Sequence, residues 1–122
     1  MPWNLSNDRP IYLQLIEHIK LLIISGVYKP GDRLPSVRDF AAEASVNPNT
    51  MQKALSELER EQLIITNRTS GKFISEDEAM ILKLKKDIAK AEIEKFLTNM
   101  SKLGFTKQET LTILEDISNK EQ

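Results

Sequence analysis

The chain has no cysteine, a single histidine, a single tryptophan and no excess of basic residues. Without cysteine it can form no disulfide framework, thiolate metal site or cysteine nucleophile, and a reducing, cytoplasmic setting is expected. The only histidine, His18, has no companion ligands, so we predict a structural or surface role for it, with no metal site and no cofactor. Long apolar runs are also missing, so we expect neither a membrane-spanning segment nor a membrane partner.

The balance of charge restricts how the protein could bind nucleic acid. The 122 residues carry 17 lysines and arginines against 18 acidic residues, for a net charge of −1. Neither residues 1–75 nor residues 76–122 are basic overall, whereas proteins that neutralise DNA phosphates usually have a basic surface. Any DNA binding must therefore depend on a few well-placed cations. The length suits one folded domain with an extension.

Two short helices are predicted in the first part of the chain. Residues 10–25 place apolar side chains at spacings of three and four, which indicates an amphipathic helix that begins near Pro10 and ends at Gly26. Residues 28–32 favour a turn because proline and glycine follow one another there. A second helix should begin at Ser36, whose hydroxyl can cap free N–H groups.

A third helix follows after a very short break. Asn47 is suited to the cap and Pro48 to the first helical position, so a helix is expected over about 48–61. Its apolar positions should face the core, and its other face carries neutral polar groups and a lysine, which suit base edges and phosphates. The expected core positions of this helix are Met51, Ala54, Leu55 and Leu58.

A β-hairpin is predicted next, since residues 63–66 and 72–75 are rich in β-branched and aromatic side chains and enclose a polar tip at 67–71. Residues 1–75 therefore have the pattern of a winged helix-turn-helix, in which the second helix of the motif enters the major groove. The fold class is α+β, mainly α. The candidate DNA-binding residues are Ser36, Arg38, Asn49, Thr50, Gln52, Lys53, Arg68, Ser70, Gly71 and Lys72.

Residues 76–122 predict two more helices. A long helix is expected over 77–103 and ends at Gly104, and the sequence from Thr106 to Glu109 is a capping box that opens the last helix. Two helices are too little to enclose a ligand pocket of roughly several hundred Å³, and an effector, if one exists, is unknown. The apolar residues spread over more than one face, which favours a dimerisation segment over a monomeric helical cap. The candidate dimerisation residues are Ile81, Leu84, Ile88, Phe96 and Met100.

These motifs resemble a known family. Residues 9–75 are similar to the N-terminal domain of GntR-family bacterial transcription regulators, through the motifs Pro10-Ile11-Tyr12, Pro30 to Ser36, Arg38 and Leu55 to Ile64. The stretch from Val46 to Leu55, together with the short C-terminal part, resembles the YtrA-like subfamily. This resemblance implies a homodimeric repressor on a palindromic operator in double-stranded DNA, often beside genes for an ABC transporter.

The resemblance also assigns roles by position. Arg38 corresponds to the family's early-helix arginine that contacts DNA, Thr50 to its threonine at the start of the recognition helix, and Gly71 to its wing-tip glycine. Many relatives carry arginines where this chain has Pro48 and Gln52. Their guanine contacts therefore do not transfer, and the operator sequence stays undetermined.

Other interpretations of the same pattern remain open. A winged helix can also bind a partner protein without DNA, which would suit the near-zero net charge. An enzyme is the weakest class, because no nucleophile-base pair or phosphate-cradling loop is present in the sequence. Activation and repression are not distinguished. Trp3 fits equally well against the first helix or against a neighbouring subunit.

Overall fold

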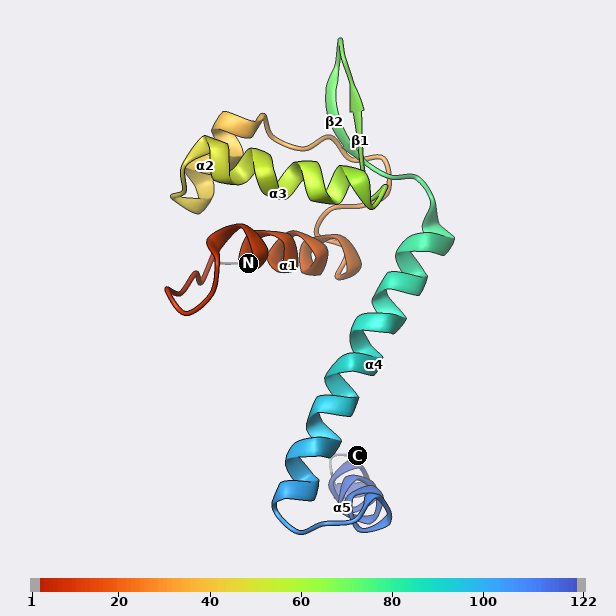
Figure 1. Ribbon diagram of the computed structural model, residues 1–122. Coiled ribbons are helices and arrows are strands. Elements are labelled where there is room, and N and C mark those ends of the chain that lie inside the picture. The colour runs from red at the N-terminus through yellow and green to blue at the C-terminus, as the bar shows by residue number, and fades with distance from the viewer. Residues whose placement is uncertain (1–2, 121–122) are drawn as a thin grey trace. The chain divides into compact units, whose positions relative to one another are not determined.

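The protein is described by a computed structural model that covers residues 3–120. The chain divides between Lys83 and Leu84 into two compact units. The elements follow one another in the order α1 (Ile11–Ile24), α2 (Val37–Ala44), α3 (Pro48–Arg60), β1 (Ile64–Asn67), β2 (Gly71–Ile74), α4 (Glu78–Lys102) and α5 (Lys107–Lys120). Figure 1 shows the ribbon, which confirms a mainly α fold with a two-stranded wing.

Local signals set most helix boundaries of the first unit. The Ser36 hydroxyl accepts a hydrogen bond from the backbone N–H of Asp39 and opens α2. The Asn47 side chain accepts one from the N–H of Asn49, with Pro48 at the first position of α3, as predicted. Pro10 stands one position earlier than predicted, at the N-cap of α1. Ser45 turns the chain between α2 and α3 through a left-handed conformation with φ of 57°.

One hydrophobic core joins the three helices and the wing of the first unit. The predicted apolar faces of α2 and α3 are buried, except that Val37 is only half-buried, and in α1 the outer positions Tyr12 and Ile16 are also half-buried. Burial of such side chains contributes roughly 1.5–3 kcal/mol each. The largest fully buried apolar side chains are Leu15, Ile19, Phe40, Met51, Leu55, Leu58, Ile64 and Ile74.

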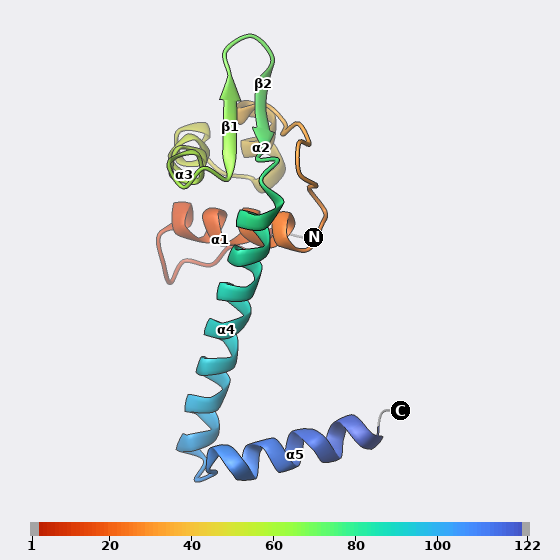
Figure 2. The ribbon, with the colours of Figure 1, turned by 90° about the vertical axis from the view of Figure 1, so that its right-hand side faces the viewer.

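The wing is a tight antiparallel hairpin whose strands are offset by one residue from the prediction. Asn67 pairs with Gly71, and the tip is formed by residues 68–70. The Asn67 carboxamide oxygen accepts hydrogen bonds from the N–H and the hydroxyl of Thr69, at 3.0 and 2.9 Å. Gly71 has φ of 110°, which favours glycine because it has no Cβ. Figures 1 and 2 show the hairpin projecting beyond α1, α2 and α3.

The second unit contains the rest of α4 and the helix α5. The capping box predicted at the start of α5 is present: Thr106 N–H donates to the Glu109 carboxylate, and Glu109 N–H donates to the Thr106 hydroxyl. The backbone hydrogen bond from Thr106 holds the pKa of Glu109 below its usual range. No side chain of α4 is buried.

Candidate nucleic-acid interface

The exposed face of α3 carries most of the predicted base-contacting side chains. Asn49, Gln52 and Lys53 are exposed, and Thr50 is half-buried. The Gln52 amide nitrogen donates to the Ser56 hydroxyl at 3.0 Å. This bond uses one amide hydrogen and leaves the carbonyl oxygen and the other hydrogen available, the pair of groups that a glutamine presents to adenine.

Lys53 differs from its neighbours because an aromatic ring holds its ammonium group. The Lys53 nitrogen lies 3.8 Å from the centre of the Tyr12 ring, which belongs to α1. A cation–π contact of this kind is worth about 0.5–1 kcal/mol at an exposed site. The charge of Lys53 is therefore located near the start of α1, and not on the outermost edge of α3.

A hollow between the wing and the start of α2 collects four of the predicted residues. Its volume is about 550 Å³, and Ser36, Arg68, Gly71 and Lys72 line it. Arg38 and Ser70 are exposed but do not line the hollow. Eight of the ten predicted residues thus fall into two sets, four on α3 and four lining the hollow, and Arg38 and Ser70 belong to neither set.

Several cations of the first unit are already paired with acids. Lys72 donates to the Thr66 hydroxyl at 2.9 Å and lies 3.7 Å from the Glu59 carboxylate. Arg60 binds Glu57 at 2.6 Å, and this hydrogen bond lowers the pKa of Glu57. Within residues 3–120, Arg38 and Arg68 have no carboxylate partner. Unpaired positive charge is therefore present on this surface although the chain is nearly neutral.

The model of the family described as "Bacterial regulatory proteins, gntR family" matches residues 11–74, which include the three helices and the wing. The chain belongs to the GntR family. The HTH-type transcriptional repressor YtrA of Bacillus subtilis is 51% identical over 71 residues, which are 58% of this chain and 55% of YtrA. This GntR protein is therefore a transcription regulator with a DNA-binding winged helix-turn-helix, and not an enzyme.

Solved structures of GntR proteins extend the similarity to both units. A GntR family transcriptional regulator from Listeria monocytogenes is 40% identical, with a TM-score of 0.85 over 92% of this chain and 98% of that one. The DNA-binding domain of AraR, solved in complex with operator ORX1, is 25% identical with a TM-score of 0.53, over 62% of this chain and 92% of that one. Because the match to the Listeria monocytogenes structure covers 92% of this chain, it includes the second unit.

One cation of the hollow in this GntR regulator, Arg33, is not among the residues predicted from the sequence. Arg33 lines the hollow, is exposed, and has no carboxylate partner among residues 3–120. The only signal in the sequence is its place between the turn at Gly31 and the buried Leu34, where alternation puts the arginine on the outer side. Its approach to the wing depends on long-range pairing that periodicity does not show.

The N-terminal segment of the GntR regulator packs on its own helices, which decides between the two positions open for Trp3. The centre of the Trp3 ring lies 4.1 Å from the centre of the His18 ring in α1. It lies 5.4 Å from the centre of the Phe40 ring in α2, and these two rings meet edge to face. Burial lowers the pKa of His18, and its Nε2 is buried without a hydrogen-bond partner. His18 is a packing residue of the DNA-binding unit.

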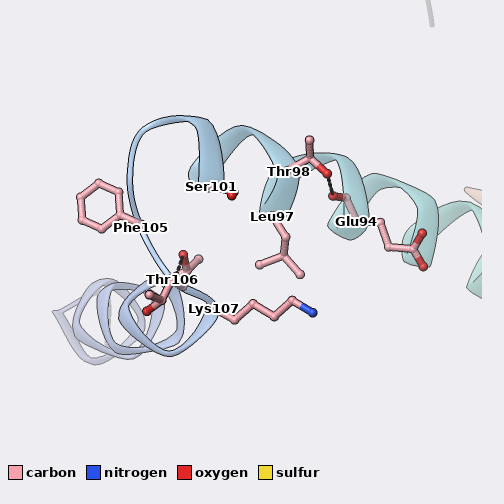
Figure 3. Close-up of a pocket in the computed structure, with 8 residues that line it drawn as sticks. Glu94, Leu97, Thr98, Ser101, Phe105, Thr106 and Lys107 are labelled. Atoms are coloured by element: carbon pink, nitrogen blue, oxygen red, sulfur yellow. Dashed lines mark hydrogen bonds between the residues drawn. The ribbon is translucent and has the colours of Figure 1, made fainter.

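The second unit of the GntR regulator has a hollow of about 400 Å³ between the end of α4 and the start of α5. We expected no pocket of this volume in two helices; the volume is reached because the hollow is open to solvent and not enclosed. Figure 3 shows Leu97 pointing toward the space between the two helices, with Lys107 extended beside it. The Thr98 hydroxyl donates to the Glu94 carbonyl, and the Thr110 hydroxyl donates to the Thr106 carbonyl. Both hydroxyl hydrogens are therefore used in bonds within the chain.

Among residues 3–120, no helix is long and apolar enough to cross a membrane. The same range contains no group of three or more histidine, aspartate or glutamate side chains arranged to hold a metal ion.

Proposed function

We propose that the protein is a cytoplasmic, homodimeric repressor that binds a palindromic operator in double-stranded DNA. The observation that carries this proposal is the pair of surfaces on one unit: the exposed polar face of α3 and the cationic hollow beside the wing. In a helix-turn-helix dimer the two recognition helices enter successive major grooves about 34 Å apart. The relative YtrA is a transcriptional repressor.

Residues 1–75 are proposed as the DNA-reading domain of this repressor, and the role of each site residue follows from its place. Asn49, Thr50 and Gln52 stand in the first two turns of α3, where helix-turn-helix proteins contact bases. Arg38 and Arg68 carry unpaired charge for phosphates or the minor groove. The resemblance to the YtrA-like subfamily extends the proposal to an ABC-transporter operon as the regulated target.

Residues 76–122 are proposed as the dimerisation segment. Ile81, Leu84, Ile88 and Met100 are only half-buried, and Phe96 is 40% exposed. On α5, Leu111, Leu114 and Ile117 follow at intervals of three and are each more than 40% exposed. Such a row of exposed apolar side chains marks a surface for another protein chain, and a second copy supplies the same row.

An electrophoretic mobility shift with a duplex selected from a random DNA pool tests the proposal. Binding to the selected duplex in the nanomolar range, together with much weaker binding to a scrambled duplex, is expected at physiological salt. Equal affinity for both duplexes would refute sequence-specific recognition. Recovery of a protein partner with no binding to either duplex would favour a protein-interaction winged helix.

Sedimentation tests the dimer separately. Leu114→Glu places a charge in the exposed apolar row of α5 and should convert the dimer to a monomer, with weaker operator binding. The neighbouring Glu115→Lys changes an exposed residue outside that row and is the matched control. A wild-type protein that sediments as a monomer at micromolar concentration would refute the dimer.

A further inference from the structure

The segment before α2 pairs with β2 through an isolated antiparallel β-bridge. The backbone N–H of Gly31 donates to the Ile74 carbonyl at 3.0 Å, that of Ile74 to the Asp32 carbonyl at 2.8 Å, and that of Leu34 to the Lys72 carbonyl at 2.9 Å. Arg33 therefore lies opposite Phe73 of β2. These bonds fix the backbone of Arg33 against the base of the wing.

The side chain of Arg33 lies over the first residue of β2. A Cβ placed on Gly71 would be 3.4 Å from Arg33 Nε and 3.5 Å from Nη2, which is ordinary van der Waals contact. The guanidinium thus covers the part of the wing where the backbone has no side chain. No carboxylate among residues 3–120 pairs with the guanidinium. Its N–H groups are therefore available to an anion of another molecule.

The surroundings of Arg33 favour an anion. Arg68 and Lys72 line the same hollow, and Lys72 is partly neutralised by Glu59. Asp39 is the one acid among the residues that line it. Three cations against one acid leave a net positive hollow, and arginine binds phosphate oxygens with two parallel N–H groups.

We propose that Arg33 binds a backbone phosphate of the operator where the wing meets α2, an inference that rests on the proposed DNA-binding function. The phosphate is preferred to a base edge because the Arg33 backbone is fixed opposite Phe73 and its side chain lies against Gly71, within the paired part of the hairpin, whereas the tip at 68–70 projects beyond the last pair. A phosphate contact adds affinity for every DNA sequence and fixes the register of the protein on the duplex.

The salt dependence of binding by Arg33→Ala tests this contact. Each neutralised phosphate adds about 0.9 to the slope of log affinity against log salt concentration. The variant should therefore lose about 0.9 of slope, and its affinity deficit should shrink about 3.5-fold between 50 and 200 mM salt. The probes are the duplex selected by the wild-type protein and its scrambled version, and the deficit should be the same for both.

Two further variants serve as controls for Arg33→Ala. Lys29→Ala removes a cation from the same loop that does not line the hollow, and it should keep the wild-type slope. Arg33→Lys keeps the charge and should keep most of the slope. Thermal unfolding followed by circular dichroism should give the same midpoint for all three variants, because both positions are exposed.

The outcomes separate this proposal from the proposed function. An unchanged slope for Arg33→Ala, with wild-type protein that still prefers the selected duplex, would overturn the phosphate contact alone. A deficit confined to the selected duplex would also overturn it, since it would indicate a base contact. Wild-type protein that does not distinguish the two duplexes would overturn sequence-specific recognition, whatever the slope of the variant.

Discussion

Removing the acid beside Lys72 should tighten DNA binding. In Glu59→Gln the carboxylate that lies 3.7 Å from the Lys72 nitrogen becomes a neutral amide, while the hydrogen bond from Lys72 to Thr66 stays. A phosphate bound by Lys72 would lie about 7 Å from Glu59, where two like charges repel by about 0.6 kcal/mol in water. Loss of that repulsion corresponds to about threefold higher affinity at low salt.

Screening sets the salt dependence of this gain. With a Debye length of about 8 Å at physiological ionic strength, the repulsion falls to about 0.25 kcal/mol and the gain to about 1.5-fold. The cost to folding should be small, because the contact is long at 3.7 Å, the Glu59 side chain is 39% exposed, and Lys72 keeps its hydrogen bond to Thr66.

Fluorescence anisotropy with a labelled duplex at 50 and 150 mM salt would measure the change caused by Glu59→Gln. Glu17→Gln is the control, since Glu17 also pairs with an arginine, Arg9, but within the N-terminal region outside the hollow. Unchanged or weaker binding by Glu59→Gln, with a normal unfolding midpoint, would contradict the role given to Lys72. An equal gain in Glu17→Gln would show that total charge is responsible, and not the place of the acid.

Three other predictions concern the same unit. Arg38→Ala and Gln52→Ala should each cost about 1–3 kcal/mol in operator binding if they contact bases; titration of the selected duplex checks this, and wild-type affinity would remove the residue from the site. Since burial lowers the pKa of His18 below 6.5, the unfolded chain takes up the proton first, and stability should fall as pH drops below about 6.5. Urea unfolding at pH 7.5 and 5.5 should show a smaller fall in His18→Gln. Leu55→Ala should cost about 2–5 kcal/mol of unfolding free energy in the same assay because Leu55 is fully buried.

Local sequence signals predicted most of the fold. The caps at Ser36, Asn47 and Thr106 were predicted because each depends on side chains within three residues of the helix start. The pairing of residues 31–34 with β2 was missed because its hydrogen bonds, such as the one between Leu34 and Lys72, join residues far apart in the sequence. The strands of the hairpin were placed one residue off because the paired Asn67 and Gly71 look like turn residues.

The surface was harder to predict than the fold. Residue type and helical position selected Arg38, Gln52 and Lys53 as candidates, and these assignments remain predictions. What the sequence could not show is which cations are paired inside the chain: the contact of Lys53 with Tyr12 and that of Lys72 with Glu59 each join two different elements. Available charge depends on these tertiary contacts and cannot be counted from composition.

The hydrogen bonds between residues 31–34 and β2 divide the hairpin into a base, which is bonded to the preceding loop, and a tip, which is not. Its base is bonded to residues 31–34, so we expect the Arg33 backbone and β2 to keep their relative position when DNA binds. Only the tip at 68–70, beyond the last paired residues Asn67 and Gly71, is left to adjust. If the wing enters the minor groove as proposed, we expect these three residues to adapt to differences in groove width between operators, while the bonded base keeps its geometry.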